Sequence, residues 1–181
     1  MIHFVPEKDK MTEEEYRKAA SFWDRKSGVK MGSDELRKRV FEYLNENSVC
    51  ALASGSGDCV RCTPLEYSFH DGDFWIFTEG GHKFLSLEKN VCVSLAVYDN
   101  NPSFNELRSV QVTGKAEIVE PFSERYVSHA EYKKISLPAL KKLSEEGHPM
   151  YLLCIHPSLM EVLFSSFRKD GYDPRQTLFL S

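Results

Sequence analysis

Residues 73–98, DFWIFTEGGHKFLSLEKNVCVSLAVY, decide the fold of this 181-residue chain. Their pattern predicts a strand, a glycine turn, one short helix and a second strand. The turn contains Gly80 and Gly81, and His82 and Lys83 follow directly. Two glycines let the backbone curl closely around a ligand, while free N–H groups and a lysine favour an anion. The turn is therefore a candidate phosphate site, and the alternative is a plain turn edged by a lysine.

Short alternating segments surround this stretch and predict further strands. Asp71–Gly72 is a hairpin signal between two of them. The tail from Phe167 is expected to be irregular. Many short strands with few crossovers favour an antiparallel barrel or sandwich. The expected strands are 49–54, 60–70, 74–79, 91–99, 110–119, 150–156 and 159–166, the last two joined at His156–Pro157–Ser158.

Helices are expected at the N-terminus and between the later strands. Thr12 and Glu15 have the spacing of a capping box for a helix over 13–25, and Ser33 is a candidate cap for a helix over 34–46. A short helix should begin at Lys83. A helical region over 123–146 should break near Pro138. The chain then divides into a helical extension (1–32), a β domain (33–167) and a tail (168–181).

Composition narrows the classes of partner. The net charge is −4 and the pI is about 5.9, with scattered basic residues, which does not favour a nucleic-acid partner. No apolar run approaches the roughly 20 residues of a membrane span. The N-terminus lacks the pattern of a signal peptide, and five cysteines fit a reducing compartment. The expected location is the cytoplasm, with no membrane partner.

Arg61 is a second candidate for an anion site. If its strand continues the hairpin at Asp71–Gly72, Arg61 should lie near Lys83, so that two cations flank one anion. Cys59 and Cys62 form a C-x-x-C, but no second such pair and no Cys/His finger spacing accompany it, so no metal site is expected. No nucleophile motif or catalytic triad is evident in the sequence.

The order of these motifs resembles a known family. The pattern RCTPLEY (61–67), FWIFTEGGHKFLSLEKNVCVSLAVYD (74–99) and VQVTGKAEIVE (110–120) is similar to the pyridoxamine 5′-phosphate oxidase-like, FMN-binding split-barrel proteins. The resemblance implies a mainly β fold, a six- to seven-stranded antiparallel split barrel with flanking helices. It also implies a homodimer with the flavin at the subunit interface.

The resemblance assigns roles to particular residues. Arg61 and Lys83 would hold the FMN phosphate, with Gly81 in the turn and His82 as a further donor. The remaining expected cofactor-binding residues are Cys62, Thr63 and Pro64 along the isoalloxazine ring, Phe77 and Thr78 beside it, and Ser109 or Gln111 from a strand wall.

The expected function is an FMN-dependent oxidoreductase with an unidentified small-molecule substrate. The segment 165–181, SSFRKDGYDPRQTLFLS, lacks the tryptophan and the Arg-x-His type pair of the true oxidases, which argues against vitamin B6 as substrate. One alternative is a non-catalytic flavin- or haem-binding module, with His129 or His156 as haem ligand. Another is a barrel that has lost its ligand.

Overall fold

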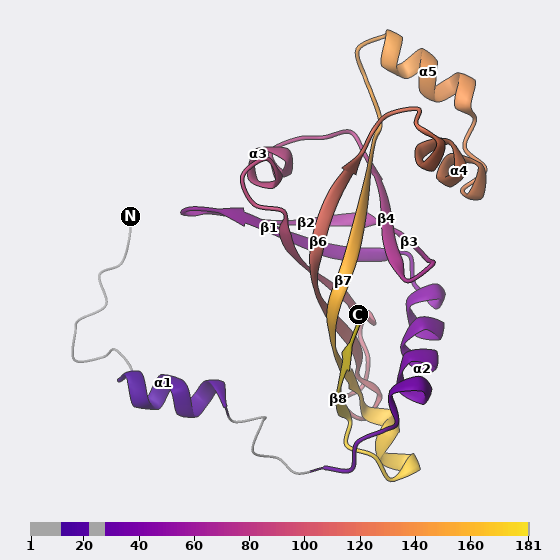
Figure 1. The fold of residues 1–181 in the computed structure, drawn as a ribbon. Coiled ribbons are helices and arrows are strands. Elements are labelled where there is room, and N and C mark those ends of the chain that lie inside the picture. The colour runs from indigo at the N-terminus through magenta and orange to yellow at the C-terminus, as the bar shows by residue number, and fades with distance from the viewer. Residues whose placement is uncertain (1–11, 22–27, 181) are drawn as a thin grey trace.

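The computed structural model describes residues 12–21 and 28–180. Within them, eight strands form one antiparallel sheet in the order β2-β1-β5-β6-β7-β4-β3, and β8 pairs with β7 beside this path. The sheet curls into a half-barrel, which confirms the expected antiparallel barrel class (Figure 1). The strands are β1 Val49–Ser56, β2 Cys59–Glu66, β3 Ser68–His70, β4 Asp73–Thr78, β5 Cys92–Tyr98, β6 Arg108–Val119, β7 Tyr151–Phe164 and β8 Arg175–Phe179.

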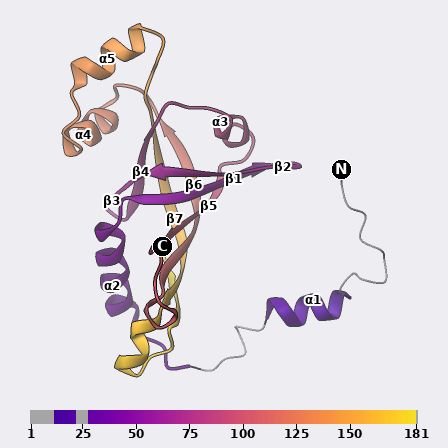
Figure 2. The ribbon, with the colours of Figure 1, turned by 180° about the vertical axis from the view of Figure 1, so that it is seen from behind.

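Helices flank the sheet. In Figures 1 and 2, α4 and α5 lie together at one end, and α2 runs along the side of β3 and β8. None of the described helices is long and apolar enough to cross a membrane. The helices are α1 Glu13–Ala20, α2 Ser33–Glu46, α3 Lys83–Leu87, α4 Glu124–Tyr132 and α5 Leu137–Glu145, with 3-10 turns η2 Phe104–Glu106 and η3 Ser165–Asp170.

Two helix starts test the capping predictions. The capping box of Thr12 and Glu15 is confirmed, although α1 ends at a Ser21 cap and residues 22–27 lie outside the described part. Ser33 was the wrong cap for α2. Gly32 holds the extended cap conformation and its carbonyl accepts from Leu36 N at 2.9 Å, which makes Ser33 the first helical residue.

The main core lies between α2 and the inner face of the sheet. The predicted stripe of α2 is confirmed, because its four apolar side chains are all buried. Phe74 and Ile76 of β4 join this core, whereas Trp75 points the other way and packs with Tyr126 of α4. β4 is therefore buried on both faces, as its unbroken apolar run suggests. The stripe consists of Leu36, Val40, Tyr43 and Leu44.

β7 is one continuous strand, so the two final strands predicted on either side of His156–Ser158 were wrong. A β-bulge explains the difference: Thr113 pairs with Leu159 and Gly114 with Pro157, which leaves Ser158 as an extra residue. A bulge accommodates a proline that cannot donate to the ladder. The tail is also not irregular, because β8 pairs with the second half of β7.

The predicted strand over 60–70 is divided at Tyr67. Tyr67 N donates to the carbonyl of Ser48 at 2.8 Å, and its hydroxyl donates to the carbonyl of Leu44 at 2.8 Å. Before this anchor β2 pairs with β1, and after it β3 pairs with β4. Arg61 therefore faces Ser54 of β1, and the predicted pairing of Arg61 with the strand before Lys83 was wrong.

Candidate functional site

The cationic side chains of Arg61 and Lys83 and the imidazole of His82 form a cluster, called here the cationic cluster, at the open edge of the sheet. Arg61 Nη1 lies 3.4 Å from His82 Nδ1. His82 caps α3, which packs beside β1 and β2 and so carries His82 and Lys83 to the strand of Arg61. The turn before them has φ of 97° at Gly80 and 94° at Gly81, a left-handed region that favours glycine.

Lys83 is the buried member of this cluster. Its residue is 7% exposed, and its Nζ donates to the carbonyl of Gly80. Burial lowers the pKa of Lys83, the charge of Glu79 opposes that effect, and Arg61 lowers it further. Within residues 12–21 and 28–180, no carboxylate forms an ion pair with Arg61, His82 or Lys83. The cluster is therefore suited to an anion supplied from outside the chain.

The other predicted residues of β2 divide between the two faces of the sheet. Arg61 pairs with Ser54, whose side chain is buried on the inner face. Because strand side chains alternate, Thr63 shares the inner face with Arg61, while Cys62 and Pro64 lie on the outer face. β2 is thus an exposed edge strand that offers small and polar groups on both faces.

Ser109 and Gln111 lie apart from the cationic cluster. They line a groove of about 1120 Å³ on the outer face, between β6, β7 and β8 and the segments 28–30 and 171–174. Gln111 belongs to the same cross-strand row as Pro64, through Ala96 and Ala51. The structure thus connects these residues to Pro64 across one face and does not bring them to Arg61.

Phe77 and Thr78 point to opposite sides of β4. The ring of Phe77 lies 5.3 Å from that of Tyr126 and 5.4 Å from that of His129, so it supports α4. Thr78 is buried and pairs with Tyr151 of β7. Thr78 is the last residue of β4 and lies just before the glycine turn.

His129 is enclosed. Its residue is 2% exposed, its Nδ1 lies 3.0 Å from His70 Nε2, and its ring stacks on Trp75 at 5.1 Å. Burial, with smaller contributions from His70 and Lys133, lowers the pKa of His129 to about 4. The ring is therefore neutral near pH 7 and offers no open face to a ligand.

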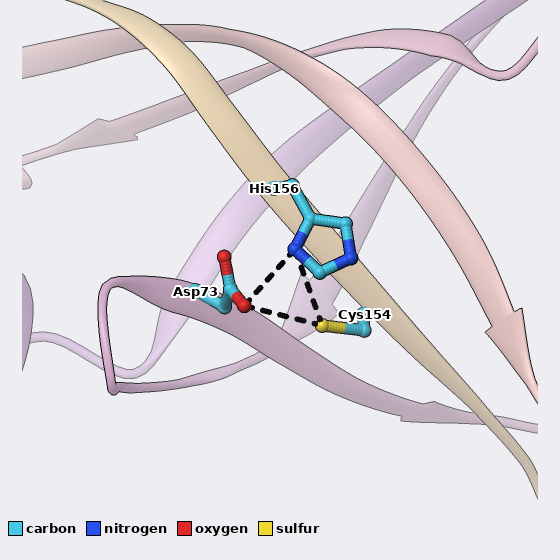
Figure 3. A group of neighbouring side chains, drawn as sticks. All are labelled: Asp73, Cys154 and His156. Atoms are coloured by element: carbon cyan, nitrogen blue, oxygen red, sulfur yellow. Dashed lines mark hydrogen bonds and ion pairs between the residues drawn. The ribbon is translucent and has the colours of Figure 1, made fainter. Parts of the chain in front are cut away.

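His156 belongs to a second polar group that sequence reasoning missed. Its Nδ1 faces the carboxylate of Asp73 and the sulfur of Cys154 (Figure 3). Cys154 and His156 are two residues apart on β7 and so share a face. A Cys-x-His pattern on a strand was the available signal, but Asp73 lies far away in sequence and only the pairing of β4 with β7 brings it close.

Comparison with known proteins adds an independent result. The family profile described as pyridoxamine 5′-phosphate oxidase matches residues 37–160. No curated protein matches the sequence. The solved structures that match include proteins of three bacteria, at 14% to 22% identity.

These structures share the fold over most of their length. An FAD-binding protein of Mesorhizobium loti is 20% identical with a TM-score of 0.52, over 74% of this chain and 93% of that one. A conserved hypothetical protein of Mycobacterium tuberculosis is 22% identical with a TM-score of 0.57, over 77% and 89%. A haem storage protein of Vibrio cholerae is 14% identical with a TM-score of 0.52, over 70% and 91%. They confirm the split-barrel fold expected from the sequence.

Proposed function

The chain belongs to the pyridoxamine 5′-phosphate oxidase family, and from that premise we propose that it binds FMN and acts as an FMN-dependent oxidoreductase. One observation carries the proposal. Arg61, His82 and buried Lys83 converge, and none of them forms an ion pair with a carboxylate in the described part of the chain. A phosphate monoester supplies the charge that this cluster lacks.

The residues of the cluster would act by binding and orienting the phosphate. Arg61 offers a planar guanidinium with several donors, and Lys83 offers a point charge that is already partly desolvated. Gly80 and Gly81 keep side chains away from the turn, so that the backbone can approach the ligand. When bound, FMN supplies hydride and single-electron chemistry at its ring. The chain then needs no catalytic triad of its own.

The ring would lie along β2, where Cys62, Thr63 and Pro64 follow Arg61. We further propose a homodimer in which a second copy covers the outer face of the sheet. The cross-strand row Pro64, Ala51, Ala96 and Gln111 is only partly covered by the described residues of one chain, and the small side chains of Ala51 and Ala96 leave room for a second chain to approach. We propose the cytoplasm as its location, because all five cysteines are free thiols.

A haem-binding function has less support. The haem storage protein of Vibrio cholerae shares the fold, but His129 is enclosed by a ring stack and His156 is hydrogen-bonded to Asp73 and Glu117. His129 is only 2% exposed and both nitrogens of His156 face carboxylates, so neither ring is open to a haem. The similarity to the Vibrio cholerae protein therefore supports the fold of this chain, and it does not support haem as its ligand.

The absorption spectrum of the purified chain tests the proposal. Bound FMN is expected as a shifted flavin spectrum with quenched fluorescence, either as purified or on titration with FMN at micromolar concentration. FAD and riboflavin serve as comparison ligands, because riboflavin lacks the phosphate that the cluster would hold. A chain that binds none of the three, or that binds riboflavin as tightly as FMN, contradicts the proposed phosphate site.

A further inference from the structure

Asp73, Cys154 and His156 meet on the face of the sheet that α4 covers. Cys154 and His156 stand on β7, and Asp73 is the first residue of the neighbouring strand β4 (Figure 3). Thr78 ends β4 at its other end, just before the glycine turn. This polar group is therefore separate from the cationic cluster.

The spacing of its donor atoms is that of a metal site. His156 Nδ1 lies 3.0 Å from Asp73 Oδ2, Cys154 Sγ lies 3.7 Å from the same oxygen, and Sγ lies 4.0 Å from Nδ1. Ligands bound tetrahedrally to Zn²⁺ at roughly 2.0–2.3 Å are separated by about 3.3–3.6 Å. Shifts of a few tenths of an ångström therefore give these three atoms the required spacing.

We propose that Asp73, Cys154 and His156 bind a zinc-type divalent metal ion, with Glu117 as the positioning residue. A thiolate, an imidazole and a carboxylate form a ligand set that suits Zn²⁺ and Co²⁺ rather than Mg²⁺ or Ca²⁺. The thiolate and the carboxylate together balance the two charges of the ion. Three protein ligands leave a fourth position for water.

Glu117 orients the imidazole of His156. Its Oε2 lies 3.2 Å from His156 Nε2, while its Oε1 accepts from Arg125 Nη1 at 2.7 Å. A proton on Nε2 that is donated to Glu117 leaves the lone pair of Nδ1 directed at Asp73 and Cys154. A carboxylate behind a histidine ligand is the usual second partner in zinc sites.

The ion has a route to the site. Cys154 forms the buried floor, but the side chains of Asp73 and His156 are 24% and 47% exposed. Binding would release two protons to solvent, the thiol proton of Cys154 and the proton shared by His156 Nδ1 and Asp73. Without metal, the same groups form a hydrogen-bonded charge network, which is the competing interpretation.

The sequence did not predict this site. The expectation of no metal came from the single C-x-x-C at Cys59 and Cys62, which lies on β2. Zinc ligands are usually recognised by short spacings in loops and helices. Here two ligands alternate along one strand and the third arrives by strand pairing, so only the register of β4 against β7 reveals the set.

Titration of the metal-stripped full-length chain with Co²⁺ tests the proposal. We expect one Co²⁺ per chain, a thiolate-to-cobalt charge-transfer band in the near ultraviolet, tetrahedral bands in the visible, and displacement by Zn²⁺. Cys154→Ser should abolish the charge-transfer band. Cys92→Ser, at an exposed cysteine on β5, should leave it unchanged.

Two further variants keep the test decisive if the buried Cys154→Ser variant folds poorly. Asp73→Asn should retain the charge-transfer band but weaken binding at least tenfold. Glu117→Gln should weaken binding roughly ten- to a hundredfold, as for other partners behind metal-bound histidines. Absence of the band in the parent chain, its persistence in Cys154→Ser, or unchanged affinity in Asp73→Asn and Glu117→Gln would each overturn the proposal and leave a charge network only.

Discussion

Arg61 Nη1 lies 3.4 Å from His82 Nδ1, although the two residues are 21 positions apart in the sequence. The two residues meet because α3 packs beside β1 and β2. The anion site therefore depends on the position of a five-residue helix as well as on the residues themselves. Experiments should therefore distinguish substitutions of the cluster residues themselves from substitutions that move α3.

Arg61→Ala and Lys83→Ala are each expected to weaken FMN binding about ten- to a hundredfold. A charge-assisted contact to phosphate contributes about 1.5–3 kcal/mol, which sets this range. Fluorescence titration with FMN measures the effect. Lys89→Ala is the matched control, because Lys89 is an exposed lysine just after α3. Equal affinities for the parent and both cluster variants would place the phosphate elsewhere.

Lys83→Met should show that the contribution of Lys83 to FMN affinity is separate from its contribution to the free energy of unfolding. Burial lowers the pKa of Lys83, so its charged form is disfavoured in the flavin-free fold. Replacing it by an apolar side chain of similar length should leave the free energy of unfolding unchanged or raise it by on the order of 1 kcal/mol, while FMN affinity falls. Urea denaturation without flavin measures the first quantity. A clear loss of stability would show that the ammonium group supports the fold.

His129 should make the fold sensitive to mild acid. The folded state holds the pKa of His129 at about 4, below the ordinary 6.5, so the unfolded chain takes up the proton first. The stability that the neutral ring provides is complete above pH 6.5 and is lost as the pH falls toward 4. The loss approaches about 1.4 kcal/mol per pH unit, up to about 3 kcal/mol in total.

Denaturation of the parent and of His129→Phe between pH 7 and pH 4 checks this expectation. Phenylalanine keeps a ring against Trp75 but cannot titrate, so its stability should fall less steeply with acid. His148→Phe, at an exposed position after α5, should retain the slope of the parent. Identical slopes for all three proteins would assign the acid sensitivity to other groups.

Gly114→Ala should destabilise the sheet at the bulge. A Cβ at Gly114 would lie 2.5 Å from the carbonyl oxygen of His156, which is backbone and cannot turn aside. Overpacking of this kind costs about 1–3 kcal/mol. Thermal or urea denaturation measures the loss. Gly32→Ser, where a Cβ meets nothing within 4 Å and a serine can cap α2, should be neutral or stabilising. Equal stabilities of Gly114→Ala and the parent would mean that β7 shifts freely at the bulge.

Ala96→Glu should dissociate the proposed homodimer. Ala96 lies in the outer cross-strand row between Ala51 and Gln111, and two copies of the variant would bring carboxylates into the interface. Light scattering should change from about twice the chain mass to 20.8 kDa. Leu143→Glu, at an exposed apolar residue of α5, is the control for added charge. A parent chain that is already monomeric contradicts the dimer.

Local patterns predicted the elements well. The buried stripe of α2, the hairpin at Asp71–Gly72 and the strand–turn–helix–strand order around Lys83 all follow from residue type and spacing. These features depend on interactions between residues close in sequence. The family resemblance then correctly predicted the split barrel, which the hydrophobic pattern alone left open between a barrel and a sandwich.

Apart from the cap of α2, which is Gly32 and not Ser33, the errors concern contacts between distant residues. A bulge opposite Gly114 lets β7 run through Pro157, and pairing with β7 makes a strand of residues 175–179 that has no strong pattern of its own. Arg61 was expected near Lys83 by extension of the wrong hairpin. Arg61 does lie near enough to lower the pKa of Lys83, but because Tyr67 diverts the strand and α3 packs beside it.

β7 has a consequence for how the newly made chain folds. Its first half pairs with β4, its second half with β8, and nearly its whole length, residues 152–164, with β6. The β3–β4 hairpin therefore leaves the ribosome long before β7 is synthesised, and the second edge of β4 stays unpaired during that interval. Such an edge is a target for wrong pairing between nascent chains, so we expect chaperones to engage this protein until residues 151–155 of β7 have emerged.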